Sequence, residues 1–77
     1  MALILYQRDD CHLCDQALEV LALARAPELE HVWIDADPLL EAAYGQRVPV
    51  LREPRSNSEL DWPFDVQAVQ RFLSSLA

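Results

Sequence analysis

Two short apolar runs, separated by one helix-patterned stretch, occupy the first 35 residues and constrain the fold of this chain most strongly. The run Ala2–Tyr6 is too short for a helix and apolar enough for a buried strand. The run His31–Asp35 has an apolar centre of β-favouring residues. Because a strand–helix–strand crossover within one sheet is right-handed, we expect these two strands to be parallel neighbours.

The stretch between the two runs carries a single apolar face. Its members fall on one side of a 3.6-residue helix, namely Cys14, Ala17, Leu18, Leu21 and Ala24. Asp10 is a candidate N-cap, and Pro27 marks the end of the helix. The pattern therefore predicts an amphipathic helix whose buried stripe begins at Cys14.

The middle of the chain predicts a short helix followed by a third strand. The helix spans Pro38–Tyr44, with Asp37 as its cap and a left-handed Gly45 after its last turn. The strand spans Val48–Leu51. Its Pro49 restricts it to a sheet edge, a strand start or a special peptide geometry.

A hairpin and a last helix complete the chain. Glu53–Asn57 is rich in turn-forming residues, and Ser58–Trp62 reads as a weak fourth strand. Asp65 is the expected cap of the last helix. The core face of that helix is predicted to hold Val66, Val69, Phe72 or Leu73, and Leu76. The element order is β-α-β-α-β-β-α, an α/β fold with a four-stranded mixed sheet and helices on both faces.

The size and the net charge of the chain limit the classes of function that it can have. The chain has 77 residues, about half of them apolar, so we expect residues 1–77 to form one small domain, and we expect a monomer. Its net charge of −7 argues against nucleic acid or an anionic membrane as the main partner. The N-terminal apolar run is too short for a signal peptide, so we expect a cytoplasmic protein. In that compartment a CxxC motif is more often catalytic or metal-binding than a structural disulfide.

Cys11-His12-Leu13-Cys14 contains the only two cysteines of the chain. This spacing lets one thiol attack a disulfide while the other resolves the mixed disulfide. Cys11 is the expected nucleophile, because backbone N–H groups at a helix N-terminus stabilise a thiolate. Arg8 and a protonated His12 would add to this effect, whereas the neighbouring carboxylates of residues 9 and 10 would oppose it. Cys14 begins the buried stripe, which suits a resolving thiol.

Several other residues are candidates for substrate contacts. The guanidinium groups of Arg8 and Arg47 can each bind a substrate carboxylate, or lie solvated at the surface. His12 can tune the disulfide or donate a proton, or can be an exposed residue with only an electrostatic effect. Trp33 and Trp62 are expected to be packing residues.

With these residues in place, the chain resembles the thioredoxin fold and, within it, the glutaredoxins, in particular small bacterial glutaredoxin-like proteins. The Cys11–Cys14 motif follows the first strand, and Val48-Pro49 stands where that family has its cis-proline loop. The resemblance implies a thiol–disulfide oxidoreductase with a cis Pro49, no bound cofactor and glutathione as a candidate co-substrate. It also implies that the backbone of Val48 pairs with glutathione and that Arg8 replaces the family's carboxylate-binding lysine. The implied partners are a protein or low-molecular-weight disulfide, and glutathione or a thioredoxin-type reductase as reductant.

The chain departs from the glutaredoxin pattern at two places. His12 and Leu13 replace the usual proline and aromatic residue between the cysteines. Asp61–Asp65 replaces the Gly-Gly turn that lets the backbone approach glutathione. Two alternatives therefore remain open. One is a metal or iron–sulfur module in which a dimer supplies two CxxC pairs, and the other is a thioredoxin-fold binding domain without turnover.

Overall fold

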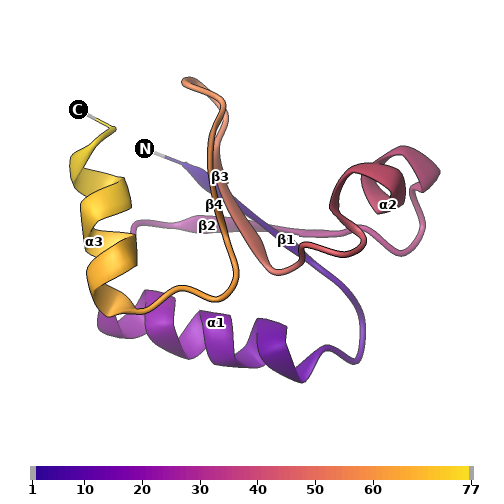
Figure 1. Ribbon diagram of the computed structural model, residues 1–77, viewed down its shortest axis with the longest axis horizontal. Coiled ribbons are helices and arrows are strands. Elements are labelled where there is room, and N and C mark those ends of the chain that lie inside the picture. The colour runs from indigo at the N-terminus through magenta and orange to yellow at the C-terminus, as the bar shows by residue number, and fades with distance from the viewer. Residues whose placement is uncertain (1, 77) are drawn as a thin grey trace.

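The computed structural model describes residues 2–76 and confirms the predicted element order (Figure 1). Its elements are β1 (Leu3–Gln7), α1 (His12–Leu23), β2 (Leu29–Trp33), α2 (Pro38–Tyr44), β3 (Val50–Glu53), β4 (Ser58–Asp61) and α3 (Val66–Ser74). Within these residues, none of the helices combines the length and apolar character needed to cross a membrane.

The four strands form one mixed sheet in the order β2-β1-β3-β4. β1 is parallel to β2, as the crossover rule predicts, and antiparallel to β3. β3 and β4 form the predicted hairpin, and the Glu53 carboxylate closes its turn by accepting the backbone N–H groups of Arg55 and Ser56. The C-terminal end of β1 therefore lies between the end of β2 and the start of β3.

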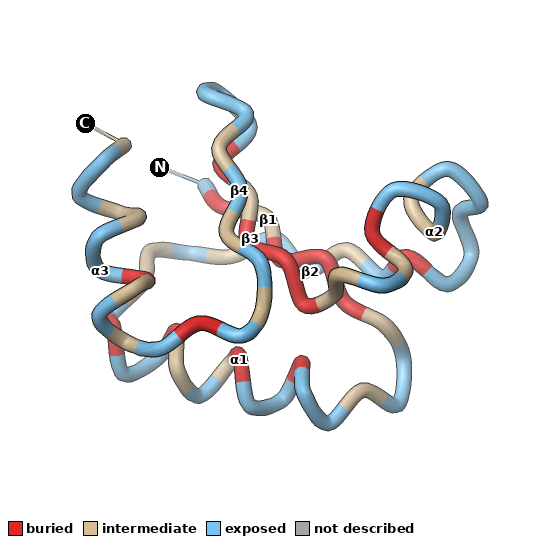
Figure 2. Tube along the Cα trace, viewed as in Figure 1, coloured by how far each residue is buried: buried red, intermediate tan, exposed pale blue. Residues whose placement is uncertain are grey.

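Side chains that alternate along β1 divide the core into two clusters. Leu3 and Leu5 are fully buried and pack with residues of α1 and α3 on one face of the sheet. Tyr6 belongs to a second cluster on the other face, where its ring stacks on Tyr44 of α2 at a centroid distance of 4.2 Å. The buried residues of the sheet belong to its two central strands, β1 and β3, whereas the outer strands β2 and β4 are half-buried or exposed (Figure 2). The prediction of helices on both faces is confirmed.

Two of the three predicted helix caps are confirmed. The Asp37 carboxylate accepts the backbone N–H groups of Leu39 and Leu40, and Asp65 accepts that of Ala68 at 2.7 Å. The predicted Asp10 cap of α1 is wrong, because Asp10 has a left-handed φ of 53°. Cys11 is the cap instead: its backbone is extended, and its thiol accepts a backbone N–H.

Gly45 is also not what the sequence pattern predicts. Its φ is −53°, so the C-terminal end of α2 has no left-handed residue at this position. A Cβ atom here would lie 2.5 Å from the carbonyl oxygen of Glu41 and 2.8 Å from its carboxylate, and 3.4 Å from Arg8 Nη2. Glycine is required because these groups approach the backbone closely, and not because of its conformational freedom.

The strand boundaries shift by one to two residues from their predicted positions. β2 begins at Leu29, because the parallel register pairs Leu29 with Leu3 at the start of β1. β3 begins at Val50, directly after Pro49, which has no N–H group to donate to a neighbouring strand. The cis-proline segment therefore lies at the start of this strand, next to the end of β1.

Candidate active site

The chain turns sharply between β1 and α1 and delivers Cys11 to the first turn of the helix. Asp10 makes this turn in its left-handed conformation, and the Asp9 N–H donates to the Asp35 carboxylate at 3.1 Å. Cys11 follows in an extended conformation, half-buried and in the free thiol form. Its Sγ accepts the backbone N–H of Cys14 at 3.2 Å. This N–H of the first helical turn is shared, because it also donates to the Cys11 backbone carbonyl at 3.1 Å, and it is thus directed in part at the predicted nucleophile.

Cys14 lies one helical turn further and is the buried member of the pair, with 1% of its surface exposed. Burial, together with the neighbouring Cys11 thiol, raises the pKa of the Cys14 thiol to about 11. The backbone N–H of Arg8 opposes this shift. The prediction that Cys14 is the less accessible thiol is confirmed, and a buried neutral thiol beside an accessible one is the arrangement that a resolving cysteine needs.

The Val48–Pro49 peptide bond is cis, as the resemblance implies. The pairing of Val50 with Tyr6 places this segment beside the C-terminal end of β1, where the chain leaves for Cys11. The Pro49 carbonyl accepts the backbone N–H of Trp62, which joins the segment to the end of β4. The Trp62–Pro63 bond, within the segment that replaces the Gly-Gly turn, is cis as well.

The Arg8 side chain forms hydrogen bonds with other residues of the protein. Its guanidinium makes a two-pronged pair with the Glu41 carboxylate, at 3.0 Å and 2.5 Å. The same group donates to the Gly45 carbonyl at 2.8 Å. We call these contacts the Arg8 clamp. The clamp joins the loop before Cys11 to the end of α2, three residues before the cis-proline segment. A carboxylate ligand of Arg8 would have to displace Glu41.

Arg47 is engaged in a similar way, away from the thiols. It donates to both oxygens of Asp61 at 3.0 Å and 2.7 Å, and to Glu59 at 2.6 Å. These hydrogen bonds lower the pKa of the Asp61 carboxyl. Tyr44 completes the network, because its hydroxyl donates to Glu59 at 2.6 Å and its ring lies under the Arg47 guanidinium. The network fastens the residue just before Val48 to β4.

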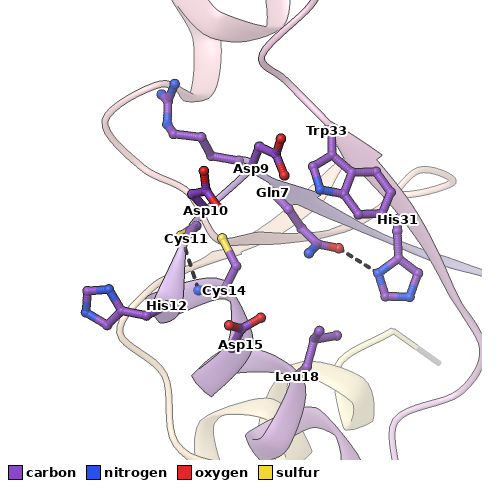
Figure 3. A pocket seen from close by; sticks show the side chains of 11 residues that line it. Gln7, Asp9, Asp10, Cys11, His12, Cys14, Asp15, Leu18, His31 and Trp33 are labelled. Atoms are coloured by element: carbon purple, nitrogen blue, oxygen red, sulfur yellow. Dashed lines mark hydrogen bonds between the residues drawn. The ribbon is translucent and has the colours of Figure 1, made fainter.

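A groove beside the two cysteines is the feature that sequence reasoning missed (Figure 3). This dithiol groove has a volume of about 620 Å³ and lies between the start of α1 and the end of β2. It is lined by Gln7, Arg8, Asp9, Asp10, Cys11, His12, Cys14, Asp15, Leu18, His31 and Trp33. Of the predicted substrate residues, Arg8 and His12 belong to this lining, whereas Arg47, Val48 and Pro49 do not. In Figure 3 the His12 ring points away from Trp33 and His31.

Trp33 corrects one expectation from the sequence. It was expected to pack, as Trp62 does against Phe64 in the core, but 52% of its surface is exposed. His31 and Trp33 alternate along β2 and pair with Leu5 and Gln7 in β1, so both reach the face that carries α1. The signal was present in the sequence as two ring side chains spaced by two, at the first and third positions of the predicted strand His31–Asp35.

Metal binding by a single copy finds no support in the geometry. Among residues 2–76, no group of three or more histidine, cysteine and carboxylate side chains is arranged to hold a metal ion. Two cysteines from one chain are too few for a zinc site or an iron–sulfur cluster. The metal alternative therefore needs ligands from a second copy.

Comparison with known proteins places this geometry in a family. A model of the glutaredoxin-like domain family (DUF836) matches residues 2–74. The crystal structure of the structural genomics target XcR50 from X. campestris is 60% identical, with a TM-score of 0.91, and the match covers 95% of this chain and 96% of that one. Protein Ne2328 from Nitrosomonas europaea is 31% identical, with a TM-score of 0.77 over 92% of this chain and 88% of that one. No curated protein matches the chain significantly.

These matches extend over nearly the whole chain. They support a redox-type module of the thioredoxin fold. We conclude that this chain belongs to the glutaredoxin-like domain family (DUF836).

Proposed function

We propose that this protein is a thiol–disulfide oxidoreductase that uses Cys11 as nucleophile and Cys14 as resolving thiol. The observation that carries the proposal is the asymmetry of the pair. Cys11 is half-buried and accepts the N–H of Cys14 at the helix N-terminus, whereas Cys14 is 1% exposed and is difficult to ionise. The Cys11 thiol is accessible to a substrate disulfide, and the Cys14 thiol lies buried one helical turn further along α1.

The reaction proceeds in two exchanges. The Cys11 thiolate attacks one sulfur of the substrate disulfide, and the first substrate thiolate leaves and takes up a proton. Cys14 then loses its proton and attacks Cys11 Sγ, which breaks the mixed disulfide and releases the second substrate thiol. The protein ends with a Cys11–Cys14 disulfide, and two electrons have passed to the substrate. Two glutathione molecules or a thioredoxin-type reductase return these electrons, and we place this cycle in the reducing cytoplasm.

The high pKa of Cys14 does not block the second exchange. A thiol near pKa 11 holds little thiolate at neutral pH, but a more basic thiolate is a stronger nucleophile once formed. The mixed disulfide on Cys11 also removes the thiol whose proximity helps to raise the pKa of Cys14. We therefore expect resolution to be faster than the acidity of the reduced pair alone would indicate.

The test compares the wild type with Cys11→Ser and Cys14→Ser. We expect the wild type to show a reversible two-electron transition, at roughly −180 to −270 mV, in glutathione and dithiothreitol buffers. Cys11→Ser should lose reduction of a small disulfide, whereas Cys14→Ser should accumulate a mixed disulfide on Cys11 that mass spectrometry detects. Full activity of Cys11→Ser would overturn the proposal.

Two further measurements separate the alternatives. Parallel assays with glutathione plus glutathione reductase, and with thioredoxin reductase, identify the route by which electrons return. Iron and zinc analysis after anaerobic purification tests the dimeric cluster module. A cluster bound by Cys11 and Cys14 in the wild type, together with an absence of disulfide reduction, would replace the oxidoreductase by that module.

A further inference from the structure

The dithiol groove is an open hollow directly beside the two cysteines, where a substrate disulfide would have to bind. Both cysteines belong to its wall, and it shares Asp9 and Trp33 with a second hollow of about 310 Å³ that is also lined by Asp35 and Ala36. A peptide whose disulfide meets Cys11 can therefore extend its neighbouring residues toward Trp33 and past the C-terminal end of β2. His12 also belongs to the wall of the groove, but its ring points away from Trp33 and His31 (Figure 3).

The charges of this groove are almost all negative. Asp9, Asp10 and Asp15 line it, and none of them forms an ion pair with another residue of the described chain. Arg8 is the one arginine in the wall, and its charge is neutralised by Glu41. An acidic surface of this kind favours the approach of a positively charged ligand.

Two further side chains point to a peptide as the ligand. Gln7 is 95% buried by its neighbours, with only 5% of its surface exposed, and its amide reaches the groove. The Gln7 Oε1 lies 2.6 Å from His31 Nδ1, whereas its Nε2 has no acceptor among residues 2–76 and can donate to a peptide carbonyl. The exposed ring of Trp33 can stack against a guanidinium or ammonium group.

We propose that the dithiol groove selects peptide or protein disulfides that carry an arginine or lysine close to the disulfide-bonded cysteine. This inference rests on the proposed function and names its substrate class. The basic side chain lies against Trp33 between the carboxylates of Asp9 and Asp15, and the Gln7 amide holds the peptide backbone. Glutathione disulfide is disfavoured, because its carboxylates outnumber its ammonium groups and both Arg8 and Arg47 are bonded to carboxylates.

The experiment uses three peptides that share one cysteine, each joined by a disulfide to a neutral 2-thiopyridyl group. Arginine, glycine or glutamate flanks the cysteine, and release of the thiopyridone measures the rate of attack by the reduced protein. The ratio of the arginine to the glutamate rate is the readout, because a general change in thiol reactivity cancels in it. We expect a ratio of about tenfold or more at low salt, which decreases as ionic strength rises.

The variants locate the selectivity. Asp15→Asn and Trp33→Ala should each lower the ratio by about threefold. Glu30→Gln is the matched control, because Glu30 is an exposed carboxylate of the same strand as Trp33 but pairs with Ile4 and lies on the other face of the sheet. We expect it to leave the ratio within about 1.5-fold of the wild type, since the interaction of Glu30 with a ligand across the sheet is weakened by distance and by water. A wild-type ratio near one, or equal losses in all three variants, would overturn the inference.

A binding measurement separates failure of the groove from failure of the chemistry. The same peptides with serine in place of cysteine cannot react, and the Trp33 indole resonance reports their binding. Selective binding of the arginine peptide without disulfide reduction would overturn the proposed function and keep the groove assignment. Reduction of all three peptides at equal rates, without selective binding, would overturn the groove assignment alone.

Discussion

The charged residues of this protein form two regions that differ in how their charges are neutralised. On the side of α2, the guanidinium groups of Arg8 and Arg47 are bonded to three carboxylates through short hydrogen bonds. In the dithiol groove, Asp9, Asp10 and Asp15 have no cationic partner within residues 2–76, and a buried thiol lies beside them.

This difference separates structural charges from available ones. Paired charges fix the loops around the cysteines and resist competition from ligands. Unpaired carboxylates repel one another, which gives no stability to the folded chain but leaves a field that a ligand can neutralise. If this interpretation is right, substitutions in the paired region should lower stability, whereas neutral substitutions in the groove should leave stability intact and change substrate choice.

The largest expected effect concerns the buried thiol. Because the pKa of Cys14 is raised from 9.0 to about 11, the unfolded chain loses this proton first as pH rises. The corresponding stability is fully present below pH 9 and is lost as pH rises through 11, by about 2–3 kcal/mol at about 1.4 kcal/mol per unit. Urea unfolding of the reduced protein between pH 8 and 11.5 should show the wild type losing this amount relative to Cys14→Ala. A difference in unfolding free energy between the two proteins that does not change with pH would contradict the raised pKa of Cys14.

Gly45→Ala tests the Arg8 clamp. The added Cβ would meet the Glu41 carbonyl and carboxylate at 2.5 Å and 2.8 Å, so we expect a loss of about 1–3 kcal/mol in the free energy of unfolding. In a double-mutant cycle with Glu41→Ala, the combined loss should be smaller than the sum, because the clamp is broken only once. At an unhindered site, replacing glycine by alanine usually stabilises the fold. Stabilisation by Gly45→Ala would therefore contradict the close approach of Glu41 to the Gly45 backbone.

Arg47→Ala tests the network on β4. We expect a loss of about 1 kcal/mol at neutral pH, since the ion pairs are partly exposed but share several hydrogen bonds. The folded-state pKa of Asp61 is lowered, so this contribution is present above about pH 4 and is lost as pH falls further. Thermal unfolding with Arg55→Ala as control provides the comparison, because Arg55 is an exposed arginine of the nearby turn. Equal losses of stability in Arg47→Ala and Arg55→Ala would show that the paired arginine contributes no more to stability than an exposed one.

The smallest effect is expected in the groove. Asp10→Asn keeps a side chain that tolerates the left-handed φ of 53° and removes one of the unpaired charges. We expect stability to rise by a few tenths of a kcal/mol, or by about 1–2 °C in Tm. A decrease of more than about 0.5 kcal/mol would assign the Asp10 carboxylate to the structure instead of to ligand binding.

Local sequence signals predicted α2 and the cap of α3 well. Asp37, Pro38 and Gly45 bracket α2 correctly, although Gly45 is required for a reason that helix-end statistics do not contain. The start of α1 was misplaced because aspartate is a common cap and cysteine a rare one, so Cys11 was assigned only a chemical role. Capping preferences thus located the helices but not the group that satisfies each helix end.

The groove could not be predicted from local signals, since it depends on register. Gln7 and Trp33 become neighbours only when β1 and β2 pair in parallel, and this pairing places Trp33 on the α1 face of the sheet, where it lines the groove and stays exposed. The partners of Arg8 and Arg47 come from elements up to 37 residues away, so the sequence showed the arginines without their carboxylates. The two cysteines, by contrast, lie within four consecutive residues at a helix start, and their relative burial followed from helix periodicity alone.

The Arg8 clamp has a mechanical consequence. One side chain ties the loop that delivers Cys11 to the turn that leads into Val48 and Pro49, so these two segments are fastened to each other. We expect these loops to move as one rigid body, so in the proposed reaction the protein would not reshape itself around its substrate. Disulfides in flexible or incompletely folded segments can bend to meet the thiol. We expect disulfides buried inside compact domains to be reduced only after local unfolding of the substrate exposes them.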